Sequence, residues 1–346
     1  MTIELHLGKT RGLRRLATPA GHFNMVAVDQ RHQIAQLIAR RRGAASEEAD
    51  FADMVAVKRV LVEELGQHAS AMLLDPNFCF PAALQQLPGR TGLLVTLEDN
   101  RWEETPGGRR SRLIDDWSVG KIKRCGADGV KLLAWFRPDA AADVIAHQRS
   151  LVELTGIECR RHDIALVLEL LVYPLAGRDA HGEHESPERH AELVLASVRE
   201  FAHPRYGVDL LKLESPQAGA TLPAPDGSAD HVRAQQWFDE LGAICHAAGL
   251  PWVMLSAGVS FAQFERVMEY AYAAGANGFL AGRAIWSEAL ANFPDLAAMA
   301  SALREQGPRQ LHRLAELTLR AGTSWHAHNP ALASFTAAGE VCAAYR

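Results

Sequence analysis

The chain has 346 residues, of which 48% are hydrophobic and 22% charged, a composition typical of a globular protein with a large core. A formal net charge of −5, without any Lys/Arg stripe interleaved with aromatic residues, argues against a nucleic-acid partner. No run reaches the ~18 uncharged apolar residues that cross a bilayer, and the N-terminal sequence has no apolar signal segment. The five cysteines are scattered without CxxC spacing, which favours reduced thiols, so we expect a cytoplasmic protein without a membrane partner.

Short apolar runs recur along the chain, and most are followed by a longer amphipathic stretch. Because these runs are continuous rather than alternating, they indicate parallel strands covered on both faces. The predicted strands are 23–28, 71–74, 92–97, 129–134, 164–171, 208–213, 252–255 and 278–281. The predicted helices are 47–66, 118–124, 188–201, 235–248 and 261–274, and the Ala-rich tail after residue 293 is also predicted to be helical and to pack outside the sheet.

Eight strand–helix units predict an α/β fold, either a closed (β/α)8 TIM barrel or an open doubly wound sheet. The first strand is not followed by a Gly-rich dinucleotide fingerprint, which favours the barrel. We expect a single domain over 1–346, with the barrel at about 21–290 and a C-terminal helical extension at about 291–346. Two long polar insertions, 99–116 and 174–187, follow strands and are therefore expected at the rim where barrel enzymes build their sites.

Charged residues interrupt or end four of the apolar strands. Asp29 follows the first strand, Lys131 lies in the fourth, Glu169 in the fifth and Lys212 in the sixth. An isolated buried charge is costly, so such groups are usually paired, neutralised or functional. Each residue alone could be a solvated strand end or part of a structural ion pair, but in a barrel all four side chains would converge on one pocket.

The chemistry that these four residues predict is Schiff-base formation. A lysine amine attacks a ketone only when unprotonated, and both desolvation and a neighbouring cation promote that state. We therefore predict Lys212 as the nucleophile and Lys131 as the neighbouring cation, with Glu169 and Asp29 transferring protons. An iminium accepts electrons, so a neighbouring C–C bond can break without a metal or cofactor.

Glycine-rich segments close the last two predicted strands. Ser256 and Gly258 follow the seventh strand, and Gly282 and Arg283 follow the eighth. Loops at these positions of a barrel commonly bind phosphate through backbone N–H groups, and Arg283 adds a planar cation. The alternative is that both are simply tight turns.

A dense group of histidines and acids suggests metal binding as a competing chemistry. It comprises His181, Glu183, His184, Glu185 and His190. The HxxH spacing is not a helical i, i+4 pair, so we predict a solvated loop and no metal site. Two tryptophans near the expected pocket, Trp135 and Trp286, are interpreted as core or rim packing.

Several ordered motifs carry a resemblance to a known family over about residues 21–325. They are AVDQR (27–31), SAMLLDP (70–76), DDWSVGKIKRCGADGVKLL (115–133), LELLVYP (168–174), VDLLKLESP (208–216), LSAGV (255–259) and AGRAIW (281–286). With them the chain resembles the class I tagatose-1,6-bisphosphate aldolases, and is similar to their relatives that split sulfofructose 1-phosphate.

The resemblance implies a TIM barrel that cleaves a ketose 1,6-bisphosphate, most simply tagatose 1,6-bisphosphate, to dihydroxyacetone phosphate and glyceraldehyde 3-phosphate. It also implies a homo-oligomer that needs no cofactor. The family's catalytic positions fall on Lys212, Lys131, Glu169 and Asp29, and its substrate-binding positions on Gln30, Ser256, Gly258, Gly282 and Arg283. Arg31, next in the first motif, is added as substrate-binding.

The residues leave the distal end of the substrate open. The segments 109–112 and 181–190 depart from the tagatose enzymes, and 75–80 and 131–139 are closer to the sulfosugar branch. The insertion after Asp99 and the segment 323–325 are closer to the tagatose branch. The alternatives are therefore the same mechanism on 6-deoxy-6-sulfofructose 1-phosphate, a non-catalytic regulator that binds sugar phosphates, and a metal-dependent lyase.

Overall fold

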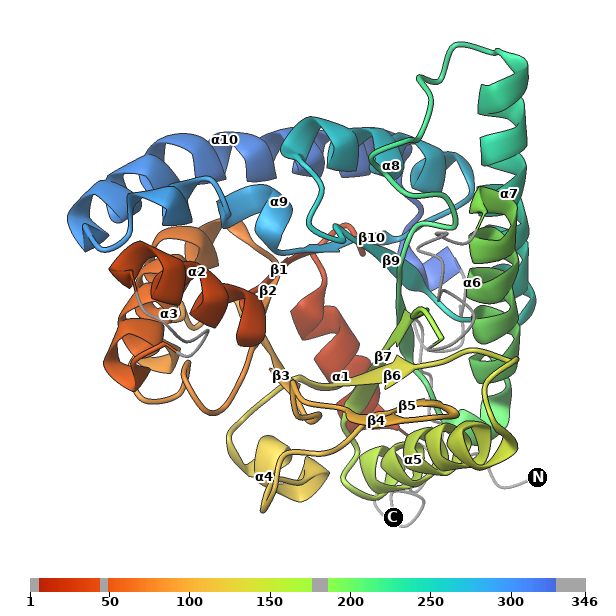
Figure 1. Ribbon diagram of the computed structural model, residues 1–346, viewed down its shortest axis with the longest axis horizontal. Helices are drawn as coiled ribbons and strands as arrows, with labels where there is room; N and C mark the ends of the chain where they lie inside the picture. Colours follow the sequence, from red (N-terminus) through yellow and green to blue (C-terminus); the bar gives the residue numbers. More distant parts are fainter. Residues whose placement is uncertain (1–5, 44–48, 176–185, 328–346) are drawn as a thin grey trace, which may run out of the picture.

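Eight apolar segments pair in parallel and close into a barrel in the order β1–β10–β9–β8–β7–β6–β3–β2 (Figure 1). In this computed structural model, residues 6–43, 49–175 and 186–327 are described. The barrel strands are β1 (Phe23–Ala27), β2 (Ala71–Leu74), β3 (Gly92–Thr96), β6 (Gly129–Trp135), β7 (Ala165–Leu171), β8 (Leu210–Leu213), β9 (Trp252–Leu255) and β10 (Gly278–Ala281). The predicted TIM barrel is confirmed, and each of its strands overlaps a predicted one.

Helices surround the barrel and occupy its outer layer. They are α2 (His32–Arg42), α3 (Phe51–Leu65), α4 (Val119–Arg124), α5 (Ala142–Arg161), α6 (Pro187–Phe201), α7 (Ala229–Ala247), α8 (Phe261–Ala273), α9 (Arg283–Trp286) and α10 (Leu296–Ala321). Ser118, Ser186, Ser228 and Ser260 cap the starts of α4, α6, α7 and α8 by accepting backbone N–H bonds. None of the helices within the described ranges combines the length and apolarity that crossing a membrane requires.

The N-terminal end of the barrel is covered by α1 (Leu7–Leu16), which crosses behind the strands in Figure 1. Leu13 and Leu16 belong to the same buried cluster as the inward side chains of the barrel, such as Met25 and Val167. Close approach to the strand ends requires glycine at position 12, where a Cβ would lie 2.2 Å from the carbonyl oxygen of Asp128. Because this layer fills the N-terminal end, a pocket can form only towards the C-terminal ends of the strands.

Two further features concern the insertion and the tail. The 99–116 insertion contains a small antiparallel hairpin, β4 (Glu103–Thr105) paired with β5 (Gly108–Arg110), which the sequence did not predict. The predicted tail helix is α10, which packs outside the barrel against α3 and α8. Arg304 of α10 donates to Glu64 of α3 at 2.9 Å. The domain boundary expected near residue 290 stays a prediction.

Candidate active site

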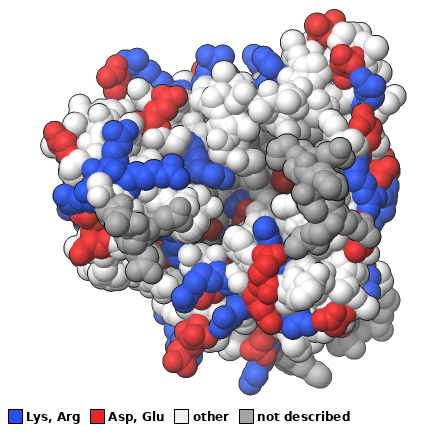
Figure 2. Space-filling model, in the orientation of Figure 1, with Lys and Arg blue, Asp and Glu red and all other residues white. Residues whose placement is uncertain are grey.

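A pocket of about 310 Å³ opens at the C-terminal ends of the strands. Figure 2 shows the molecule hollowed near the middle of this face. The four charged residues that interrupt or follow the predicted strands, Asp29, Lys131, Glu169 and Lys212, all line this pocket and are at most 8% exposed. The barrel closure thus brings together residues that lie up to 183 positions apart in the sequence, counted from Asp29 to Lys212.

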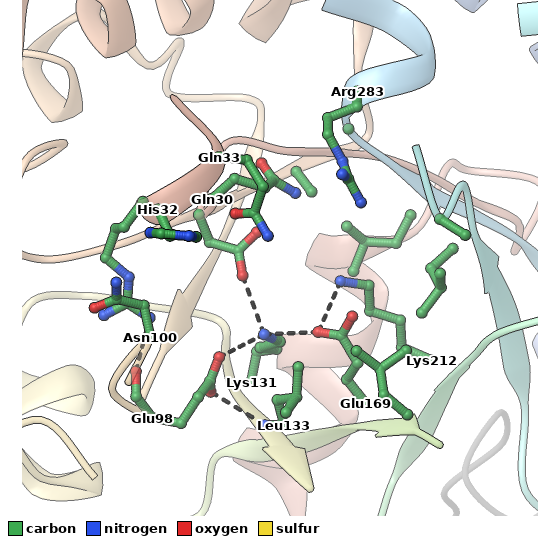
Figure 3. Close-up of a pocket in the computed structure, with 18 of the residues that line it drawn as sticks. Gln30, His32, Gln33, Glu98, Asn100, Lys131, Leu133, Glu169, Lys212 and Arg283 are labelled. Atoms are coloured by element: carbon green, nitrogen blue, oxygen red, sulfur yellow. Dashed lines mark hydrogen bonds and ion pairs between the residues drawn. The ribbon is translucent and has the colours of Figure 1, made fainter. Parts of the chain in front are cut away.

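Lys131 lies at the centre of this group (Figure 3). Its Nζ lies 3.0 Å from Asp29 Oδ2, 2.5 Å from Glu98 Oε1 and 2.6 Å from Glu169 Oε2. The Lys131 ammonium group therefore occupies the position between three carboxylates, where a metal cation could bind in another protein. A buried charge with three opposite partners is compensated rather than isolated.

The electrostatics favour the charged forms of Lys131, Asp29 and Glu169. Burial alone would lower the pKa of Lys131, but Asp29, Glu169 and Glu98 outweigh burial and raise this pKa well above its ordinary value. Burial alone would raise the pKa of Asp29, but Lys131 and Lys212 outweigh it and lower this pKa. The pKa of Glu169 is lowered by the same two lysines against the effect of burial.

Lys212 projects from β8 beside β7 and contacts Glu169. Its Nζ lies 2.9 Å from Glu169 Oε2, the same oxygen that contacts Lys131. The sequence predicted Lys131 as a bare neighbouring cation for Lys212. The structure places a carboxylate oxygen between the two ammonium groups, where it can accept a proton from Lys212 directly.

The predicted phosphate-binding residues follow β9, which neighbours β8, and β10, which neighbours β9. Ser256, Gly282 and Arg283 line the pocket, and the Gly282 N–H points at Ser256 Oγ at 3.4 Å. Gly258 was also predicted to bind phosphate, but among the described residues it is the neighbouring Ala257 that lines the pocket, and Gly258 does not. At Gly258 (φ 83°) a Cβ would lie 2.7 Å from Arg283 Cζ, so this glycine makes room for the guanidinium group instead.

Gln30 and Arg31 line the pocket from the end of β1. Arg31 is 5% exposed and donates Nη2 to the Glu98 carbonyl oxygen at 2.9 Å. Its Nε and Nη1, like Gln30 Oε1, are buried and have no protein hydrogen-bond partner in the described part of the chain. Buried donors left unpaired are costly, so an anionic ligand at this position would be stabilised.

Glu98 is a site residue that the sequence analysis missed. Besides binding Lys131, it accepts from the Leu133 backbone N–H at 3.1 Å through Oε2. The signal was available, because Glu98 ends an apolar strand as Asp29 does. The pocket also contains Asn100 and Trp102 from the same loop, and Trp135 from β6. Trp286, by contrast, is buried and donates to the Ala27 carbonyl oxygen at 2.9 Å.

The histidine-rich segment contributes little that can be described. His181, Glu183, His184 and Glu185 lie outside the described residues, while His190 Nε2 lies 3.8 Å from Glu214 Oε2. Within the described ranges, no group of three or more His, Cys, Asp or Glu side chains has the arrangement of a metal site.

Comparison with known proteins gives a consistent result. Residues 23–288 match the model of the DeoC/LacD family aldolases. The tagatose 1,6-diphosphate aldolase 2 of Enterococcus faecalis is 31% identical over 334 residues, which cover 94% of this chain and 98% of that protein. Among solved structures, the fructose-bisphosphate aldolase of Plasmodium falciparum superposes with a TM-score of 0.64 at 15% identity, covering 92% of this chain and 96% of that one. An archaeal fructose-1,6-bisphosphate aldolase, caught with its catalytic lysine bound to the carbinolamine intermediate, gives 0.55 at 15% identity, over 89% and 98% of the two chains.

Proposed function

Because this chain belongs to the DeoC/LacD aldolase family, we propose that it is a class I enzyme that cleaves tagatose 1,6-bisphosphate through a Schiff base on Lys212. The products would be dihydroxyacetone phosphate and glyceraldehyde 3-phosphate. The family membership makes the chain an aldolase. The substrate rests on the named activity of its relatives, and the residue roles rest on the pocket geometry.

The observation that carries the proposal is the contact between Lys212 and Glu169 at 2.9 Å inside a buried pocket. Glu169 takes a proton from the Lys212 ammonium group, and the free amine adds to the C2 carbonyl of the ketose. Glu169 then returns a proton to the carbinolamine hydroxyl, which leaves as water. The result is an iminium between C2 and Nζ.

The cleavage step uses the carboxylates around Lys131. Asp29, held ionised by Lys131, takes the proton of the C4 hydroxyl. The C3–C4 bond breaks, its electron pair neutralises the iminium to an enamine, and the distal half leaves as an aldehyde. Protonation of the enamine at C3 and addition of water then release dihydroxyacetone phosphate and restore Lys212.

Two anion sites complete the proposal. Ser256, Gly282 and Arg283 would bind the phosphate on C1, since Ser256 follows β9, the strand next to β8, and the other two follow β10, one strand further. Gln30 and Arg31 would bind the distal anion, since two buried nitrogens of Arg31, Nε and Nη1, have no partner among the residues that the structure describes. A cytoplasmic location and assembly into a homo-oligomer remain expectations from the sequence.

The test is reductive trapping. Sodium borohydride added with dihydroxyacetone phosphate should reduce the iminium to a stable adduct, and peptide mass spectrometry should locate it on Lys212. Lys212→Ala should give no adduct and no cleavage, whereas the exposed control Lys123→Ala should behave as the wild type. An adduct on Lys131, or one that persists in Lys212→Ala, would show that the lysine assignment is wrong.

The substrate is tested separately with tagatose 1,6-bisphosphate, fructose 1,6-bisphosphate and 6-deoxy-6-sulfofructose 1-phosphate. We expect the highest kcat/KM with the first. A clear preference for the sulfonated sugar would replace the substrate while keeping the mechanism.

A further inference from the structure

Two tryptophans form part of the pocket lining without a place in the chemistry described above. Trp102 directly precedes the β4–β5 hairpin, and Trp135 ends β6. Both line the pocket, and their ring centroids are 5.1 Å apart at an interplanar angle of 64°. We call this pair the indole wall.

Arg109, which is not among the described residues that line the pocket, holds both rings of the indole wall. The Arg109 guanidinium carbon lies 4.6 Å from the Trp102 ring centroid, 5.0 Å from that of Trp135 and 5.2 Å from that of Tyr173. Glu104 Oε2 accepts from both Trp102 Nε1 (2.6 Å) and Arg109 Nε (3.1 Å). Cation–π contacts and a shared carboxylate hold the rings in place before a ligand arrives, which lowers the entropic cost of binding.

The position of the wall follows from the order of the strands. Counted in either direction around the barrel, β3 is four strands from β9, so the loop after β3 faces the loop that contains Ser256. In Figure 3, Asn100, from that β3 loop, lies beyond the Lys131 end of the row formed by Lys131, Glu169 and Lys212, whereas Arg283 lies above its Lys212 end. A sugar with its C1 phosphate near β9 and β10 and its C2 at Lys212 therefore extends its remaining carbons towards β3 and β6.

We propose that Trp102 determines specificity for the distal half of the substrate, the half that leaves as the aldehyde, and that Arg109 is the residue that positions it. The inference rests on the proposed function. Arg109 is already bound to Glu104, so the wall offers ring surface rather than charge to the ligand. Such a surface fits the C–H groups of a straight polyhydroxy chain, while Arg31 remains available for its terminal anion.

The experiment separates the two halves of the substrate. In Trp102→Ala we expect KM for tagatose 1,6-bisphosphate, and KM for the glyceraldehyde 3-phosphate acceptor in the reverse reaction, to rise about tenfold or more. The dihydroxyacetone phosphate concentration that gives half-maximal borohydride trapping should not change. Trp102→Phe should recover most of the loss. Arg101→Ala is the neighbouring control, because that side chain is 82% exposed and lies outside the set of residues lining the pocket.

A double-mutant cycle tests the role of Arg109. Arg109→Met should raise both KM values, and this effect should disappear in the Trp102→Ala background, because the arginine acts through the indole. Additive effects would overturn the positioning role. Circular dichroism and urea unfolding check that each variant is folded. If Trp102→Ala is not folded, the rise in both KM values expected for Arg109→Met still tests the indole wall, and unchanged values would contradict its role.

The outcomes distinguish the two proposals. If the wild type forms no borohydride adduct, the proposed function itself is wrong. If the wild type forms the adduct and cleaves the sugar, but Trp102→Ala keeps the wild-type KM for ketose and aldehyde, only the role of Trp102 is wrong. A loss of trapping with dihydroxyacetone phosphate alone would also contradict it, since the wall would then contact the other half.

Discussion

Glu169 contacts both lysines of the pocket, Lys131 and Lys212, through the same carboxylate oxygen. Its Oε2 lies 2.6 Å from Lys131 Nζ and 2.9 Å from Lys212 Nζ, so one oxygen is shared by the charge-compensating lysine and the proposed nucleophile. Removing its charge without changing its shape therefore tests proton transfer more than binding.

In Glu169→Gln we expect kcat to fall by about 10²- to 10⁴-fold with little change in KM, because an amide cannot accept the proton of Lys212. Steady-state kinetics with tagatose 1,6-bisphosphate measure both constants, and Glu63→Gln, on the exposed face of α3, is the control. A large increase in KM with kcat unchanged would contradict the acid–base role.

Arg283 is expected to contribute binding rather than chemistry. Burial lowers its pKa somewhat, but a guanidinium group stays charged at neutral pH. Charge-assisted hydrogen bonds to a phosphate contribute about 1.5–3 kcal/mol, so Arg283→Ala should raise KM for phosphorylated ligands roughly 10- to 100-fold. An unchanged KM would remove Arg283 from the phosphate site.

At the scale of secondary-structure elements, a buried lysine ties α3 to β1 and β2. Lys58 and Asp75 are both fully buried and form an ion pair, and Lys58 Nζ also donates to the Val28 carbonyl oxygen at 2.7 Å. Val28 directly precedes Asp29, so this helix holds the backbone that presents a proposed catalytic carboxylate.

Lys58→Met should lower the free energy of unfolding by about 3–5 kcal/mol, because it leaves the Asp75 charge buried without its partner. Urea denaturation measures this difference. Lys58→Met combined with Asp75→Asn should recover part of the loss, since the uncompensated charge is then gone. A loss below about 1 kcal/mol in the single variant would show that water or another group compensates Asp75.

The end of β8 carries a group that should make stability depend on pH. Burial and, to a smaller extent, the charge of Glu169 raise the pKa of Glu214 from 4.5 to about 8, although a hydrogen bond from the Val172 N–H opposes the shift. The folded state therefore retains a proton that the unfolded state loses, and stability falls as pH rises from about 4.5 to about 8.

Glu214→Gln should remove this contribution, so its unfolding free energy should decline less than that of the wild type between pH 5 and 8. Thermal or urea unfolding at several pH values measures the two slopes. Because His190 Nε2 lies 3.8 Å from Glu214 Oε2, His190→Gln separates the contribution of this contact. Parallel pH profiles for wild type and Glu214→Gln would contradict the assignment.

The strands were predictable because each is a continuous apolar run between polar segments, which a barrel core demands. The β4–β5 hairpin was not, because its strands have three residues each and are polar, so no periodicity marks them. The four charged residues of the pocket could be found as exceptions to apolar strands. Their pairing could not, because only the closed barrel brings Asp29, three strands away around the barrel, to Lys131.

On the scale of the whole molecule, α1 contributes to the stability of the entire barrel. On the face that α1 turns to the barrel, Leu13 and Leu16 are buried, and Lys9 Nζ lies 2.7 Å from Asp209 Oδ2. The contact between Lys9 and Asp209 joins α1 to the start of β8 across 200 positions of the sequence.

Gly12→Ala tests this docking. In a free helix alanine would be favoured by about 1 kcal/mol, but here the new Cβ would meet the Asp128 carbonyl oxygen at 2.2 Å, and backbone cannot move aside easily. We expect a net loss of about 1–3 kcal/mol in unfolding free energy. Arg11→Ala, on the exposed face of the same helix, should change it little, and a stabilised Gly12→Ala would mean that α1 is loosely docked.

Because α1 covers the opposite end of the barrel, ligands enter and leave the pocket through the rim, so both products of the proposed reaction share one exit. In the proposed mechanism the dihydroxyacetone fragment stays covalently attached to Lys212 until hydrolysis, so the aldehyde diffuses away first. Dihydroxyacetone phosphate, which alone rebinds the empty enzyme, should then inhibit competitively against the sugar, and the aldehyde noncompetitively. The reverse pattern in product-inhibition kinetics would show that exit is not ordered in this way.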